Sequence, residues 1–178
     1  GSKMFTISVG VADFNIPRSA FLAAHPDVDV LASGALIFLH GRVLVMQRAA
    51  TDSRPLKWET PGGGVDAEDP TILHGVVREV FEEAGLRVVS VDAVVGPKEG
   101  HRFVSSRGLK VRKVSFLVTV ADASCVILDP LEHAQCLWLT EEDVRAGVHG
   151  DVRLEFTSSE QVDVILEGFQ SLESGNTT

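Results

Sequence analysis

Three glutamates near the middle of the chain are spaced so that their side chains could bind a divalent cation together. Glu79, Glu82 and Glu83 stand at positions i, i+3 and i+4, and side chains at these spacings are neighbours on the surface of a helix. Like charges so placed repel one another, and the helix dipole disfavours anions in the last turn. A divalent cation reverses both penalties, and clustered carboxylate oxygens suit Mg²⁺ or Mn²⁺. The alternative is a solvated acidic face that binds no metal.

The helix that positions these glutamates is expected over Thr71–Ala84. At about 100° per residue, its apolar side chains gather on one side, which must face the core, and the glutamates gather on the other. Asp69 is a suitable N-cap, and Pro70 suits the first helical position. Gly85 is the kind of residue that ends a helix in the left-handed conformation. The expected core face consists of Leu73, Val76, Val77, Val80, Phe81 and Ala84.

The elements around this helix are expected to be strands with a few interspersed helices. Two β-rich runs, Ala35–Leu39 and Val43–Arg48, predict a hairpin that turns at His40-Gly41. Because strands and helices follow one another in mixed order, we expect an α/β sandwich with a mixed sheet. The other expected strands are Met4–Val9, Leu86–Val95, Val111–Val120 and Gln135–Leu139. The other expected helices are Pro17–Ala24, Thr140–Ala146 and a last one from the capping box Thr157–Glu160 to about Leu172.

Length and composition narrow the class of protein. A chain of 178 residues fits one domain, and its 44% apolar and 23% charged residues are ordinary for a soluble globular protein. The formal charge of -9 argues against a nucleic-acid groove, which needs a basic stripe. No apolar run approaches the roughly 20 residues of a membrane helix, and no secretory signal stands at the N-terminus. Two cysteines form no readable disulfide framework, so we expect a cytoplasmic protein.

The segment from Gly63 to Leu86 resembles the Nudix box, the signature of a family of diphosphate hydrolases. The box reads glycine, five residues, Glu, seven residues, Arg-Glu, an apolar residue, any residue, Glu-Glu, any residue, glycine and an apolar residue. The second half, from Arg78 to Leu86, matches at every defined position. The first half has Asp69 in place of Glu and one extra residue before Arg78. The similarity includes Trp58–Gly64 and Gln47-Arg48 and extends over Leu31–Val144.

This resemblance implies a Nudix-like α/β/α sandwich with a mixed β-sheet, formed by a single domain over residues 1–178. Residues 1–30 would be an N-terminal extension and residues 155–172 the C-terminal helix. The implied activity is Mg²⁺-dependent hydrolysis of a diphosphate linkage in a nucleoside diphosphate derivative such as an ADP-sugar, and Mn²⁺ could replace Mg²⁺. The alternatives are a hydrolase of an isoprenoid or other non-nucleotide diphosphate, and a non-catalytic Nudix-like module that binds a nucleotide. The partner is then a small-molecule diphosphate, and homodimers are common in the family.

The resemblance also implies a role for each glutamate. Glu82 and Glu83 correspond to the paired metal ligands, and Glu79 to the third ligand or the catalytic base. The metal would activate a water molecule that attacks one phosphorus, while a carboxylate takes the proton. Glu132, which lies outside the box as the base often does in this family, is the other candidate base. The alternative for Glu132 is an exposed loop glutamate.

The departure in the first half of the box concerns the partner of Arg78. In the family, the arginine orients the carboxylates, and the first Glu pairs with it and supports the metal cluster. Asp69 could serve in place of that Glu, as could Glu68 by a different loop path. The alternative is that Asp69 is only an N-cap.

Glycines before the helix and two larger side chains complete the expected site. Gly63 and Gly64 permit a tight loop that brings the backbone close to metal or phosphate, with Gly63 nearest the metal. Substrate contacts are expected from Arg48, Trp58 and Gly64. Ordinary alternatives exist for the two side chains, namely a surface cation for Arg48 and core packing for Trp58.

Overall fold

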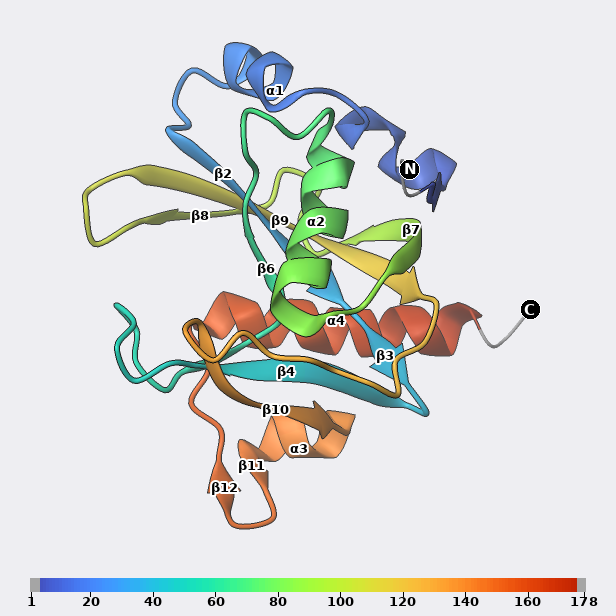
Figure 1. Cartoon of the computed structure of the whole chain (residues 1–178), viewed down its shortest axis with the longest axis vertical. Helices are drawn as coiled ribbons and strands as arrows, with labels where there is room; N and C mark the ends of the chain where they lie inside the picture. The colour runs from blue at the N-terminus through green and yellow to red at the C-terminus, as the bar shows by residue number, and fades with distance from the viewer. Residues whose placement is uncertain (1–3, 176–178) are drawn as a thin grey trace.

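The computed structural model describes residues 4–175 and arranges them as two β-sheets between helices (Figure 1). The first sheet is mixed, because β2 pairs with β9 in parallel and β1 pairs with β7 in parallel, whereas the remaining pairs are antiparallel. Its strand order is β1 (Thr6–Ile7), β7 (Val88–Val95), β9 (Lys110–Val120), β2 (Val30–Leu36) and β6 (Gly62–Gly64), with β8 (His101–Val104) also beside β9.

The second sheet is antiparallel and centres on β4. Its order is β10 (His133–Leu139), β4 (Arg42–Arg48) and β3 (Phe38–Leu39), with β5 (Trp58–Glu59) also beside β4. A separate small ribbon is formed by β11 (Val148–His149) and β12 (Val152–Arg153). The helices are η1 (Val9–Phe14), α1 (Arg18–Ala24), α2 (Ile72–Ala84), α3 (Glu141–Ala146) and α4 (Ser159–Gly175).

Two apolar cores separate the layers. Along β4 the side chains alternate between them, because successive residues of a strand point to opposite faces. Leu44 and Met46 join the core under α2, whereas Val43 and Val45 join the core under α4. The two helices therefore cover opposite sides of the sheets, as Figure 1 shows, and this confirms the α/β/α sandwich that the resemblance implies. Within residues 4–175, no helix has the length and apolar character needed to cross a membrane.

The N-cap of α2 is Thr71, whereas the sequence predicts Asp69. The Thr71 side chain accepts a hydrogen bond from the His74 N–H, and Pro70 lies outside the helix. Asp69 does not cap the helix, because its carboxylate accepts two hydrogen bonds from the Arg78 guanidinium. Two such charge-assisted hydrogen bonds are stronger than a single bond to a neutral backbone N–H at the N-cap. The predicted end of the helix is confirmed, since Gly85 has the left-handed φ of 68°.

The two faces of α2 also differ in part from the prediction. Most of the predicted core face is buried, but Phe81 is 49% exposed, while Glu83 is only 5% exposed. At about 100° per residue, Glu83 lies next to Val76 on the edge of the core face. Phe81 lies past the half-buried Val77, at the edge of the core face opposite to Glu83. One of the glutamates is therefore held at the border between the core and the solvated face.

Other predicted elements differ from the structure in their boundaries as well. The run predicted as one strand, Ala35–Leu39, divides at Ile37, where the chain leaves β2 in the first sheet and enters β3 in the second. The turn at His40-Gly41 is confirmed, with positive φ at both residues. Of the strand predicted over Met4–Val9, only Thr6–Ile7 pairs, because the chain then turns into η1. Helix α4 is capped by Ser158, whose hydroxyl accepts from the Gln161 N–H at 3.1 Å, rather than by Thr157, and it continues past Leu172 to Gly175.

Candidate active site

The Arg78 guanidinium joins α2 to the loop before it. Nε donates to Asp69 Oδ1 at 2.9 Å and Nη2 to Asp69 Oδ2 at 3.0 Å, while Nη2 also donates to the Gly64 carbonyl at 3.1 Å. Burial tends to raise the pKa of Asp69, but the hydrogen bonds from Arg78 and from the Asp66 N–H hold it below its ordinary value. Asp69 is thus the acid that pairs with Arg78, despite the extra residue between them.

Arg78 also contacts two of the three glutamates. Its Nη1 donates to Glu79 Oε1 at 3.1 Å and to Glu82 Oε2 at 3.0 Å. Glu79 lies directly beneath the glycine loop, since a Cβ added to Gly63 would stand 2.8 Å from the Glu79 carboxylate. No side chain fits at Gly63 without moving Glu79. Burial raises the pKa of Glu79, and Arg78 opposes this only in part.

Glu83 is the most enclosed of the three. Its Oε2 accepts a hydrogen bond from the Gly62 N–H at 2.8 Å. Burial raises the pKa of Glu83 to about 9, and the nearby carboxylates of Glu79, Glu59 and Glu132 act in the same direction. A buried carboxylate among like charges requires either a proton or a cation. The carboxylate oxygens of Glu83 and Glu79 are the hard ligands that Mg²⁺ prefers.

A second buried glutamate, Glu59, has the opposite surroundings. The Arg48 Nη1 donates to both of its oxygens, at 2.7 Å and 3.2 Å, and Arg48 is held in turn by Asp52. The Nε2 atom of His133 lies 3.3 Å from Glu59 Oε2. Burial tends to raise the pKa of Glu59, but His133, Lys113 and Arg48 together hold it below the ordinary value. Glu59 is therefore a stable anion beside the carboxylates of α2.

The exposed Glu132 reaches this region from the loop before β10. One oxygen of Glu132, one oxygen of Glu83 and one ring nitrogen of His133 all lie within 4.8 Å of one another. Two of these residues, Glu132 and Glu83, are distant in sequence and are brought together only by the fold.

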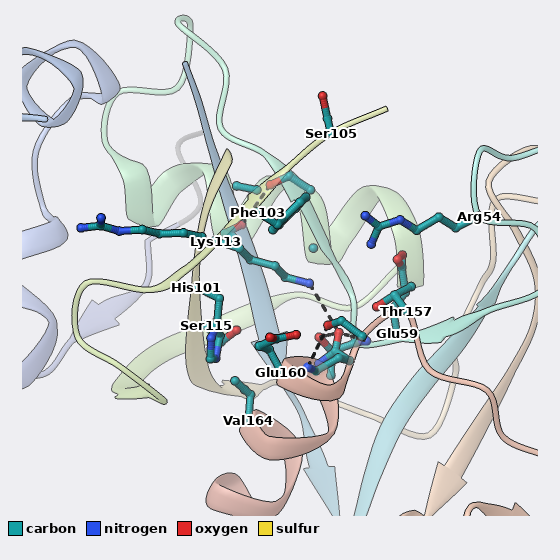
Figure 2. A pocket seen from close by; sticks show the side chains of 18 of the residues that line it. Arg54, Glu59, His101, Phe103, Ser105, Lys113, Ser115, Thr157, Glu160 and Val164 are labelled. Atoms are coloured by element: carbon teal, nitrogen blue, oxygen red, sulfur yellow. Dashed lines mark hydrogen bonds between the residues drawn. The ribbon is translucent and has the colours of Figure 1, made fainter. Parts of the chain in front are cut away.

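A cavity of about 580 Å³ opens beside the glycine loop, with Gly62 and Gly63 in its wall (Figure 2). In Figure 2 the Lys113 side chain points into it from β9, and Nζ lies 3.4 Å from the Gln161 Oε1 of α4. Burial lowers the pKa of Lys113. On the opposite side, the Arg54 guanidinium lies 5.4 Å from the centre of the Phe103 ring.

The expected site residues separate into those that meet and those that do not. The structure brings together Glu79, Glu83, Arg78 and Gly63. Glu82 lies at the solvent-facing edge of this group, with its side chain 55% exposed. Arg48 lines the cavity, although Glu59 and Asp52 bind its guanidinium.

Two expected substrate contacts lie elsewhere. Trp58 is 1% exposed and packs in the core under α4, so its indole offers a ligand no surface. Gly64 does not line the cavity, and its carbonyl accepts from Arg78. The core position of Trp58 follows from its place on β5, which pairs with the central strand β4.

Glu59, Lys113 and Gln161 line the cavity, although the sequence predicts no role for them. Glu59 carried one usable signal, because it lies in the Trp58–Gly64 segment before the box. Lys113 and Gln161 carried none, since a lysine in a strand and a glutamine in a helix are ordinary surface residues.

The chain is similar to a protein family and to several known proteins. A family model described as the NUDIX domain matches residues 29–157. A "MutT-like protein" of Streptomyces ambofaciens is 31% identical over 115 residues, which cover 65% of this chain and 66% of that protein, just under two thirds of its length. The MutT protein of Methanosarcina mazei Go1 is similar with a TM-score of 0.56 and 25% identity, covering 84% of this chain and 96% of its own. An ADP-ribose pyrophosphatase of Streptococcus suis 89-1591 has a TM-score of 0.53 and 25% identity, covering 78% and 90%.

Proposed function

The chain belongs to the NUDIX family of pyrophosphate hydrolases, and from that premise we propose that it cleaves a diphosphate linkage in a nucleoside diphosphate derivative with the help of Mg²⁺. The observation that carries the proposal is the position of Glu83, which is buried among like charges and accepts a hydrogen bond from Gly62 in the cavity wall. That position is unfavourable for an empty site and favourable for one that binds a cation.

Glu79, Glu82 and Glu83 would hold the Mg²⁺, or Mn²⁺ in its place. When bound there, the metal would lower the pKa of the attacking water and neutralise charge on the phosphate oxygens. Arg78 is a positioning residue, because it holds Glu79 and Glu82 at about 3 Å while Asp69 fixes its own orientation. Glu79 or Glu132 takes the proton from the attacking water, and both lie close enough to Glu83 to affect its charge.

The walls of the cavity support a nucleotide substrate over an isoprenoid one. They carry hydroxyl, amide and cationic groups, including Thr60, Ser115, Gln161, Lys113 and Arg54, which could bind a sugar and a base but would leave an isoprenoid chain against polar groups. The similarity to the ADP-ribose pyrophosphatase of Streptococcus suis points to the same substrate class.

A cytoplasmic location and a homodimer remain predictions from the sequence.

The test is phosphate release, coupled to a phosphatase, across nucleotide sugars, dinucleotides, nucleoside triphosphates and isoprenoid diphosphates with Mg²⁺. Glu83→Gln is compared with the wild-type chain and with Glu142→Gln, which alters an exposed glutamate of α3. We expect turnover of a nucleoside diphosphate derivative that Glu83→Gln loses and Glu142→Gln keeps. Turnover of isoprenoid diphosphates alone would replace the substrate class. Nucleotide binding without any turnover would favour a non-catalytic module.

A further inference from the structure

The imidazole of His133 is a buried group that the proposed reaction does not use. His133 is 3% exposed, and within residues 4–175 its Nδ1 atom is buried without a hydrogen-bond partner. A buried polar atom without a hydrogen-bond partner destabilises the folded state. Native structures contain few such atoms, and each of them calls for a bound water, an ion or a function.

Glu59 determines which ring nitrogen of His133 is available. Nε2 lies 3.3 Å from Glu59 Oε2, and the same carboxylate receives two hydrogen bonds from Arg48. An ionised carboxylate can only accept a hydrogen bond, so Nε2 carries the ring proton and its N–H donates a hydrogen bond to Glu59. Nδ1 then keeps a free lone pair. Histidines that bind metals are commonly oriented in this way, by a carboxylate on the other ring nitrogen.

Two carboxylates stand beside this ring. An oxygen of Glu83 and an oxygen of Glu132 lie within 4.8 Å of one another and of a ring nitrogen of His133. Glu83 is fixed by the Gly62 N–H, whereas Glu132 is exposed and can turn without disturbing the core. One cation could therefore be bound by the ring and both carboxylates after small movements of these side chains.

We propose that His133, Glu83 and Glu132 form a mixed nitrogen and oxygen site for a first-row transition-metal cation such as Co²⁺ or Zn²⁺. The proposal rests on the proposed function only through Glu83, which both sites share. Imidazole nitrogen binds these cations well and Mg²⁺ poorly, whereas carboxylates alone suit Mg²⁺. His133 thus extends the metal preference of the chain beyond that of the three glutamates on α2.

The experiment is a Co²⁺ titration of the whole chain without substrate, followed by calorimetry and visible absorption, with a Mg²⁺ titration in parallel. The variants are His133→Asn and Glu132→Gln. His40→Asn is the matched control, because His40 is an exposed turn residue with a φ of 50° that asparagine tolerates. Circular dichroism melting checks that each variant folds.

We expect His133→Asn to weaken Co²⁺ binding by about 10–100-fold and Mg²⁺ binding by less than about 2-fold. Glu132→Gln weakens Co²⁺ binding to a smaller extent, and His40→Asn leaves it unchanged. Unchanged Co²⁺ affinity in a folded His133→Asn, or an equal loss for both cations, would overturn the proposal.

The wild-type chain supplies a test that needs no variant. Co²⁺ bound at Nδ1 shifts the NMR signal of the exchangeable Nε2 proton far outside the ordinary range. The absence of that signal at saturating Co²⁺ overturns the assignment even if His133→Asn does not fold. Because these measurements use no substrate, their failure is distinct from a failure of Mg²⁺-dependent turnover.

Discussion

Glu59 on β5 and Glu83 on α2 are buried to a similar extent, with 9% and 5% of their surfaces exposed, yet their pKa values move in opposite directions. Glu59 faces Arg48, His133 and Lys113, so its pKa falls despite burial. Glu83 faces one backbone N–H and other carboxylates, so its pKa rises to about 9. Burial alone does not decide the charge of a carboxylate, because the sign of its neighbours does.

If the proposed function is right, the difference separates a structural anion, Glu59, from a metal-binding group, Glu83. Glu59 already has a cationic partner in Arg48, and it holds Arg48 and His133 in place. Within the described residues, Glu83 has no ion-pair partner within 4 Å, and its one hydrogen-bond donor is the Gly62 N–H. A site that is incomplete without a cation is what a metal-dependent enzyme requires.

The largest expected effect comes from Glu83→Gln. The amide can still accept from the Gly62 N–H, so the fold is kept, but the metal loses an anionic ligand. We expect kcat/KM for the diphosphate substrate with Mg²⁺ to fall by about 10²–10⁴-fold, because a bound metal stabilises the transition state by several kcal/mol. In metal-free buffer the melting temperature should rise, since a buried group surrounded by like charges is removed. A fall in both quantities would mean that Glu83 is a structural anion like Glu59.

Glu59→Ala should affect stability first. It leaves Arg48 and His133 without their shared acceptor, and breaking a buried pair costs about 3 kcal/mol or more. Urea denaturation measures this loss. The matched control is Glu155→Ala, which breaks an exposed ion pair with Lys57 and should cost far less stability, because solvent screens such pairs. Equal costs for the two variants would show that Glu59 contributes no more than a surface carboxylate.

Gly63→Ala tests how closely the loop approaches the glutamates. The new Cβ would stand 2.8 Å from the Glu79 carboxylate, so Glu79 must move, and we expect kcat to fall by about 10-fold, since small misplacements at a site carry such costs. Gly64→Ala is the control, because a Cβ there meets nothing within 4 Å. If both variants keep wild-type kcat, Glu79 does not act from its observed position.

The smallest expected effect is the pH dependence of stability in metal-free protein. The folded chain keeps the Glu83 proton up to a pKa of about 9, whereas the unfolded chain releases it near 4.5, so stability falls as pH rises between these values. Glu59 acts in the opposite direction, because its lowered pKa makes stability fall as pH drops below its ordinary value. Melting temperatures should therefore drop by a few degrees toward pH 9, and Glu83→Gln should flatten that slope. A slope unchanged by Glu83→Gln would assign it to other groups.

The sequence alone was enough for features that depend on near neighbours in the chain. Glu79 and Glu82 share a helix face because 3.6 residues make a turn, and Gly85 ends that helix because it tolerates a positive φ. The pairing of Arg78 with Asp69 was also within reach, because only nine positions separate them. Local geometry determines each of these.

Tertiary structure decided what the neighbours of each group would be. Glu59 meets His133 across 74 positions, and Thr60 meets Gln161 across 101, so no local spacing could reveal either contact. Trp58 is buried in the core because β5 pairs with the buried strand β4. Glu83 is buried beside the core because the glycine loop lies over it and the Gly62 N–H donates to its carboxylate. Sequence could place carboxylates on a helix, but their charge depends on burial and on groups that only the folded chain brings within a few ångströms.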